Sequence, residues 1–137
     1  MGHKNIILIL LYFILISCNK NSKECKYIAY EGKAIIISIE IAPANENNCD
    51  SNPRKVLFAF IADDSTVRNN YVFKNWSDTS VLTINSGINP SQHFIDSLDI
   101  TLGKEFSCSR QELIQGTCTP VYFRFSDINL NPENGCR

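Results

Sequence analysis

The sequence predicts a mostly β domain, either a small disulfide-stapled barrel of the OB-like type or a β-sandwich, with one or two short helices. Four observations support this fold class. Isoleucine alternates with other residues from Lys33 to Ala42, and residues 56–62 are apolar throughout. Alternation returns from Thr119 to Ser126, and the cysteines are numerous enough to pair.

The two strongest strand patterns lie on either side of an asparagine-rich loop, residues 44–54. In the first strand, from Lys33 to Ala42, four isoleucines are predicted to share one face: Ile35, Ile37, Ile39 and Ile41. Ser38 and Glu40 are predicted on the other face. The second strand, from Val56 to Ala62, is apolar on both faces, which is typical of a central strand buried on both sides.

Residues 71–76 and 80–84 are rich in β-forming residue types, and they are predicted as a hairpin or as one bent strand. The following Asn89-Pro90-Ser91-Gln92 predicts the start of a short helix. In this interpretation Asn89 is the N-cap, Pro90 lies in the first turn and Gln92 reaches back as in a capping box. The buried side of that helix is predicted to carry Phe94, Ile95 and Leu98.

A further strand is expected between residues 100 and 108, interrupted near Gly103. Ser109 and Glu112 have the spacing of a second capping box, which predicts a turn of helix that ends at Gly116. The last strand, residues 119–126, is predicted to point Val121, Phe123 and Phe125 inward and Tyr122 and Arg124 outward. A helix between the third and fourth of five strands is the OB-like arrangement.

The N-terminal segment has the features of an export signal. His3 and Lys4 are followed by residues 6–16, which carry no charge. Eleven helical residues span only about 16 Å, too little for a transmembrane helix, so this is a signal-peptide apolar region. It ends in Leu15-Ile16-Ser17-Cys18, which resembles the lipobox of bacterial lipoproteins.

This resemblance implies that residues 1–17 are a signal peptide, that Cys18 is lipidated, and that the protein is anchored in the bacterial cell envelope. Residues 18–24 then form a tether, and residues 25–137 form a single domain. Asn19 after the cysteine favours the outer membrane, and a tether without an acidic run favours a domain that faces the periplasm. The mature charge is 12 − 14 = −2, which argues against a nucleic-acid partner.

Export places the cysteines in an oxidising compartment, where pairs form disulfides. Once Cys18 carries lipid, an odd number remains: Cys25, Cys49, Cys108, Cys118 and Cys136. We predict a Cys108–Cys118 bridge, closed by the helical turn between them, and a second bridge from Cys136 to Cys49 or Cys25. The spacing C-x-x-C does not occur and the mature chain has one histidine, so we expect no metal and no cofactor.

Few residues suggest chemistry. His93 with the odd cysteine is conceivable as a catalytic dyad, but an ordinary surface or partly buried histidine is the preferred interpretation. Asp63 and Asp64 are interpreted as a solvated strand end rather than as a carboxylate cluster with Asp96 or Asp99. Residues 127–131 begin like a calcium loop, but proline at position 132 replaces the required glycine.

Aromatic residues on the predicted strands are candidates for an exposed surface that binds a glycan or a partner protein, although aromatics on the strands of a small barrel more often belong to the core. Trp76, Tyr122 and Arg124 belong to the residue types most enriched at interface hot spots, and we name them as its candidates.

The chain contains no G-x-S-x-G, P-loop or H-E-x-x-H motif. We therefore expect a non-enzymatic binding or structural module with a protein or other envelope component as its partner. The alternatives are an inhibitor-like binder of a lysozyme or protease, and a small thiol enzyme or hydrolase. The segment from Cys108 to Pro120 resembles small envelope lipoproteins of uncharacterised activity, which implies no reaction.

Overall fold

A computed structural model describes residues 24–63, 79–133 and 136. Five strands and one short helix follow one another along the described chain. They are β1 (Lys26–Ile41), β2 (Arg54–Ala62), β3 (Thr79–Leu82), α2 (Gln92–Ser97), β4 (Glu105–Gln115) and β5 (Val121–Phe125). The mostly β class is confirmed, and the helix lies between the third and fourth strands as predicted.

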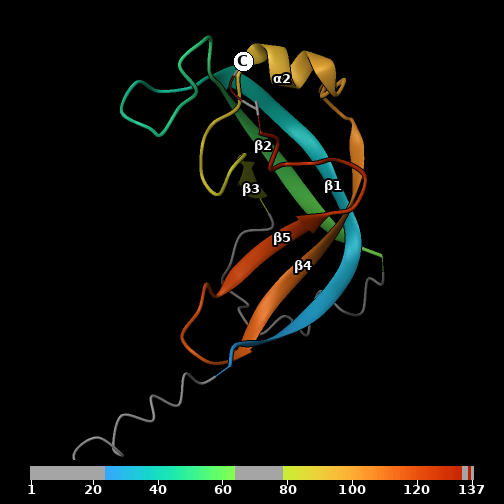
Figure 1. The fold of residues 1–137 in the computed structure, drawn as a ribbon. Coiled ribbons are helices and arrows are strands. Elements are labelled where there is room, and N and C mark those ends of the chain that lie inside the picture. Colours follow the sequence, from blue (N-terminus) through green and yellow to red (C-terminus); the bar gives the residue numbers. More distant parts are fainter. Residues whose placement is uncertain (1–23, 64–78, 134–135, 137) are drawn as a thin grey trace, which may run out of the picture.

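The five strands form one antiparallel sheet in the order β3-β2-β1-β4-β5. This is a Greek-key order, because β4 returns to lie beside β1 rather than beside β3. Figure 1 shows the sheet strongly curled, with β5 and β3 on the same side of β1 and β2. The described chain therefore forms a half-barrel from a single sheet, which is the barrel alternative of the prediction and not two packed sheets.

The long strand β1 belongs to both halves of the curled sheet. Its residues from Gly32 to Ile41 pair with β2, and those from Lys26 to Ile35 pair with β4. At Gly32 the backbone of β2 comes so close that a Cβ atom would lie 2.2 Å from the carbonyl oxygen of Ile61. Only glycine fits at this crossing, and it permits the curl.

The predicted isoleucine face of the first strand is wrong. A β-bulge between Ile36 and Ser38 shifts the register of β1 against β2. Before the bulge the even-numbered Ala34 and Ile36 are buried, whereas Ile37 is 47% exposed. A bulge exchanges the two faces of a strand, so Ile39 packs against the core on the other side of it.

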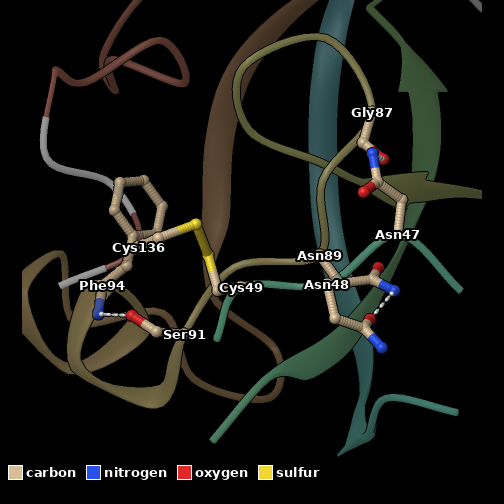
Figure 2. Close-up of a disulfide and its surroundings, with 8 residues drawn as sticks. All are labelled: Asn47, Asn48, Cys49, Gly87, Asn89, Ser91, Phe94 and Cys136. Atoms are coloured by element: carbon tan, nitrogen blue, oxygen red, sulfur yellow. Dashed lines mark hydrogen bonds between the residues drawn. A yellow bond between two sulfur atoms is a disulfide. The ribbon is translucent and has the colours of Figure 1, made fainter. Parts of the chain in front are cut away.

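The core lies inside the curl and is closed at one end by α2. Phe94 and Ile95 of α2 join one cluster with buried residues of β1, β2 and β4. The N-cap of α2 is Ser91, whose hydroxyl accepts a hydrogen bond from the Phe94 amide at 3.2 Å (Figure 2). The predicted cap at Asn89 is thus wrong by two residues, although the helix and its buried side chains are confirmed.

The helical turn predicted at Ser109 is also wrong. Residues 105–115 form one continuous strand, and Gly116 with its φ of 101° turns the chain after it. Phe106, Cys108, Arg110 and Glu112 alternate inward, and all four are buried. Because two of these buried residues are charged, the sequence does not show the alternation of apolar and polar residues that is typical of a half-buried strand.

This strand also overturns the predicted Cys108–Cys118 bridge. Cys108 lies midway along β4 opposite Phe125, while Cys118 lies beyond the far end of the strand. Seven residues of extended chain between Cys108 and Gln115 separate them by roughly 20 Å or more. The two disulfides are Cys25–Cys118 and Cys49–Cys136, so Cys108 is the free thiol. The second bridge is one of the two predicted for Cys136.

The loop between β1 and β2 is fixed against the segment before α2. The amide nitrogen of the Asn89 side chain donates to Glu46 at 2.7 Å and to Asn48 at 2.9 Å. Figure 2 shows the Asn48–Asn89 hydrogen bond together with the Cys49–Cys136 disulfide, which joins the C-terminal tail to the same loop. Lys55 of β2 completes the network as the ion-pair partner of Glu46.

Several predictions fall on residues outside the described part of the chain. These are the signal peptide and Cys18, the strand at residues 71–76, and the candidates Asp64 and Trp76. Within the described residues, no helix has the length and apolar character needed to cross a membrane.

Candidate binding groove

A groove of about 580 Å³ runs between the two outermost strands of the half-barrel, β3 and β5. Consecutive residues of both strands line it, so it follows the strand edges rather than crossing one face of the sheet. We call it the seam groove and define it by its lining residues from the strands: Phe58, Ser80, Val81, Leu82, Val121, Tyr122, Phe123, Arg124 and Phe125.

The floor of the seam groove is aromatic. Phe58 of β2 makes edge-to-face contacts with Phe123 at 5.0 Å and with Phe125 at 5.3 Å between ring centroids. Phe60 also meets Phe123, at 5.7 Å. The strand alternation of β2 and β5 turns all four rings inward. These rings join β2 to β5 by side-chain packing across the open side of the sheet.

The rim of the groove carries side chains of the opposite parity. Tyr122 and Arg124 lie two residues apart on β5, and both point to the outer face, as predicted. Val81 of β3 is 36% exposed and forms the facing rim. An apolar floor with a few polar groups at its edge is the usual character of a binding site. Of the three predicted surface candidates, the described structure brings two together at one site.

Two neighbours of Tyr122 were missed by the sequence reasoning. Tyr27 of β1 packs its ring edge-on against Tyr122 with centroids 4.9 Å apart, and its hydroxyl donates to the carbonyl of Thr119 at 2.9 Å. Gln111 of β4 stands directly opposite Tyr122 in the register. Only the pairing of β1 with β4 brings Tyr27 near Tyr122, so no local signal could have found it.

The end of the groove nearest α2 is closed by the C-terminal tail. Ile128, Asn129, Leu130 and Asn131 line it there. The carbonyl of Leu130 accepts a hydrogen bond from the Asn85 amide at 2.9 Å, which joins the tail to the turn after β3. The Asn129 side chain accepts from the Asn131 amide, so these asparagines shape a turn.

The candidates for catalysis are not brought together in a reactive arrangement. Cys108 is buried on β4, and burial together with the negative charges of Asp127 and Glu31 raises the pKa of its thiol to about 12. A thiol with that pKa is not a nucleophile at neutral pH. His93 is exposed on α2, as the preferred interpretation expected.

The aspartates are used in local structure. Asp99 forms an ion pair with Lys104 at 3.0 Å, Asp96 accepts from Gln92 at 2.7 Å, and Asp127 accepts from the Ser107 amide at 2.8 Å. Among the described residues, no three His, Cys, Asp or Glu side chains are grouped as a metal site would need.

Comparison with known proteins gives no relative: no family model, no curated protein and no solved structure matches this chain.

Proposed function

We propose that this chain is a lipid-anchored lipoprotein of the bacterial envelope and that its half-barrel is a non-enzymatic module that binds a partner protein in the seam groove. The observation that carries the proposal is the groove itself. It has an aromatic floor of Phe58, Phe123 and Phe125, and a rim that includes Tyr122 and Arg124.

The chemistry of the rim favours a protein partner. Tyrosine offers a large rigid surface with one polar end, and arginine offers several donors on a flat cation. Both are enriched where protein interfaces have most of their binding energy. A partner side chain of apolar type would occupy the floor, while carboxylate or carbonyl groups would meet Arg124 at the rim.

The two disulfides support the proposed compartment. Bridges such as Cys25–Cys118 and Cys49–Cys136 persist in oxidising surroundings and are rare in a reducing cytosol. They agree with the export and anchoring that the Leu15-Ile16-Ser17-Cys18 lipobox implies. Outer-membrane anchoring with the domain in the periplasm remains our proposal for location.

In-cell photo-cross-linking tests the function. A photo-reactive amino acid replaces Val81 at the groove rim or, in the matched control, Leu102, which is 68% exposed and does not line the groove. We expect one stoichiometric protein adduct from position 81, lost when Arg124→Glu is added, and no such adduct from position 102. Identical adducts from both positions, or none from position 81, would contradict the proposal.

The same preparation tests the remaining parts of the proposal. The intact mass of the native protein is expected to show a chain that begins at Cys18 and carries acyl groups. If the partner recovered at position 81 is a lysozyme or a protease and the purified domain abolishes its activity, the inhibitor-like alternative replaces a purely structural role.

A further inference from the structure

Two exposed isoleucines lie at the end of the half-barrel where β1 begins and β4 ends. Ile28 is 40% exposed and Ile114 is 58% exposed. Ile28 stands opposite Glu112 in the register, and Ile114 lies at a register shift between the pairs Tyr27–Leu113 and Lys26–Gln115. The two residues therefore lie on adjacent strands at the same end of the sheet, and we call the apolar surface that they expose there the isoleucine patch. We call this part of the molecule the anchor end.

The anchor end is held rigid by a disulfide and by contacts between neighbouring segments of the chain. The Cys25–Cys118 disulfide joins the chain just before β1 to the turn between β4 and β5. The Tyr27 hydroxyl also bonds the carbonyl of Thr119, and its ring packs against Tyr122. An apolar patch on such a fixed frame does not collapse inward to escape water.

The length of chain between the patch and the proposed lipid determines what lies beside it. This step depends on the proposed lipidation of Cys18. Only six residues, 19–24, separate Cys18 from Cys25, and a fully extended chain of that length spans about 25 Å at most. The 16 residues of β1 extend for roughly 50 Å, and Figure 1 shows β1 running from the anchor end to the end that bears α2. The anchor end is therefore the part of the domain that the lipid holds next to the bilayer.

The sequence between Cys18 and β1 is basic, which suits an anionic surface. Residues 19–26 contain Lys20, Lys23 and Lys26 against one acidic residue, Glu24, although the mature chain as a whole is acidic. Basic residues close to a bilayer are attracted to anionic headgroups. Tyr27 and Tyr122 are of the aromatic type that is enriched at the level of the headgroups.

From this arrangement we infer that the anchor end rests on the surface of an anionic lipid bilayer, with Ile28 and Ile114 inserted among the lipids. The lipid on Cys18 supplies attachment, and the isoleucine patch fixes the orientation of the domain. In that orientation α2 and the Cys49–Cys136 end point away from the membrane (Figure 1). The seam groove then lies along the side of an upright domain.

Lipid photo-cross-linking of the full acylated chain tests this docking. The protein is placed in vesicles of phosphatidylcholine with phosphatidylglycerol, with a photo-reactive amino acid at Ile114 or, as the control, at Leu102. We expect a phospholipid adduct in the intact mass from position 114, none from position 102, and loss of the adduct when Ile28→Asp is added. Disulfide mapping of each variant verifies that the fold is retained.

The possible outcomes separate this inference from the proposed function. Acylated Cys18 without a lipid adduct at position 114, or with a protein adduct there, overturns the docking and leaves the anchoring intact. If vesicles of phosphatidylcholine alone give the same adduct yield as vesicles with phosphatidylglycerol, the docking does not depend on anionic lipid, and the inferred anionic surface is overturned. An unmodified Cys18 in the native protein overturns both the anchoring and the docking.

Discussion

The guanidinium of Arg110 and the carboxylate of Glu112 form an ion pair with a nitrogen–oxygen distance of 2.9 Å, and both side chains are completely buried. They are two residues apart on β4, so both point into the half-barrel. The neighbouring Tyr30 of β1 lies close enough that burial and the charge of Glu112 raise the pKa of its hydroxyl. The interior of the barrel is thus polar on one side and aromatic on the other.

The first prediction follows from the burial of this pair. Removing one partner leaves a buried charge, so Arg110→Met and Glu112→Leu are each expected to lower the free energy of unfolding by about 3–5 kcal/mol. The double variant replaces both charges by apolar groups and is expected to recover most of that loss. Urea unfolding of the three variants measures the effect.

A pair of equal length on the surface is the control for this series. Lys33 and Glu105 are also 2.9 Å apart, but their side chains are 57% and 51% exposed. Lys33→Met and Glu105→Leu should produce no such loss, because exposed pairs contribute little. The interpretation would be contradicted if the free energy of unfolding lost in the Arg110/Glu112 double variant equalled the sum of the losses in the two single variants.

The second prediction concerns Gly32, where β1 passes close to β2. In an ordinary strand, alanine in place of glycine is stabilising because it restricts the unfolded chain. Here the added Cβ atom would lie 2.2 Å from the Ile61 carbonyl oxygen, a backbone atom that cannot move without shifting β2. Gly32→Ala is therefore expected to destabilise the domain by about 2–3 kcal/mol, as overpacking does.

Thermal or urea unfolding compares Gly32→Ala with a control at the exposed neighbouring residue, Glu31→Ala. It tests whether the usual stabilising effect of replacing glycine by alanine is reversed at position 32. The control is expected to remain within about 0.5 kcal/mol of the natural protein. An increase in stability for Gly32→Ala would show that the curl of β1 does not depend on the close approach.

Much of the fold was predictable because β2 is a continuous apolar run and hydrophobic alternation survives in β5. The inward direction of Val121, Phe123 and Phe125, and the outward direction of Tyr122 and Arg124, were read correctly from period two alone. The order of strands and helix also sufficed to suggest a partly open barrel. Patterns that depend on a single strand are thus visible in the sequence.

The errors arise where tertiary structure overrides a local pattern. Buried Arg110 and Glu112 gave β4 a polar sequence, and Ser109 with Glu112 matched the spacing of a helix cap. The disulfide error followed from that one misassigned strand. The bulge after Ile36 likewise has no signature in a run of isoleucines. The seam groove could not be predicted from the sequence, because the two strands that line it, β3 and β5, are far apart in the chain.

The third prediction concerns the reactivity of the free thiol. With a pKa of about 12, roughly one Cys108 side chain in 10⁵ is a thiolate at pH 7, and the sulfur is also buried. In a Cys18→Ser variant, where Cys108 is the single free thiol, a thiol reagent is expected to react only after the protein is unfolded. One thiol per chain should then appear.

Timed reaction with a coloured disulfide reagent, with and without denaturant, makes the measurement. The variant Cys18→Ser with Cys108→Ala is the blank and should show no thiol in either state. Rapid labelling of Cys108 in the folded protein would contradict its buried environment and would support the alternative function of a thiol enzyme.

The fourth prediction is a pH dependence at the loop between β1 and β2. Hydrogen bonds from Lys55 and then from Asn89 hold the pKa of the Glu46 carboxyl below its ordinary value of 4.5. A lowered pKa in the folded state means that the ionised form stabilises the fold. This contribution is complete above the unfolded pKa and is lost as the pH falls through the folded value.

Thermal unfolding from about pH 7 to about pH 3 measures this dependence. We expect Glu46→Gln to be less stable than the natural protein at neutral pH, and we expect the difference in Tm to vanish at the acid end. Asp50→Asn, an exposed carboxylate of the same loop, is the matched control and should not reproduce that convergence. A Glu46→Gln difference that stays constant down to the acid end would mean that the carboxylate charge does not hold this loop in place.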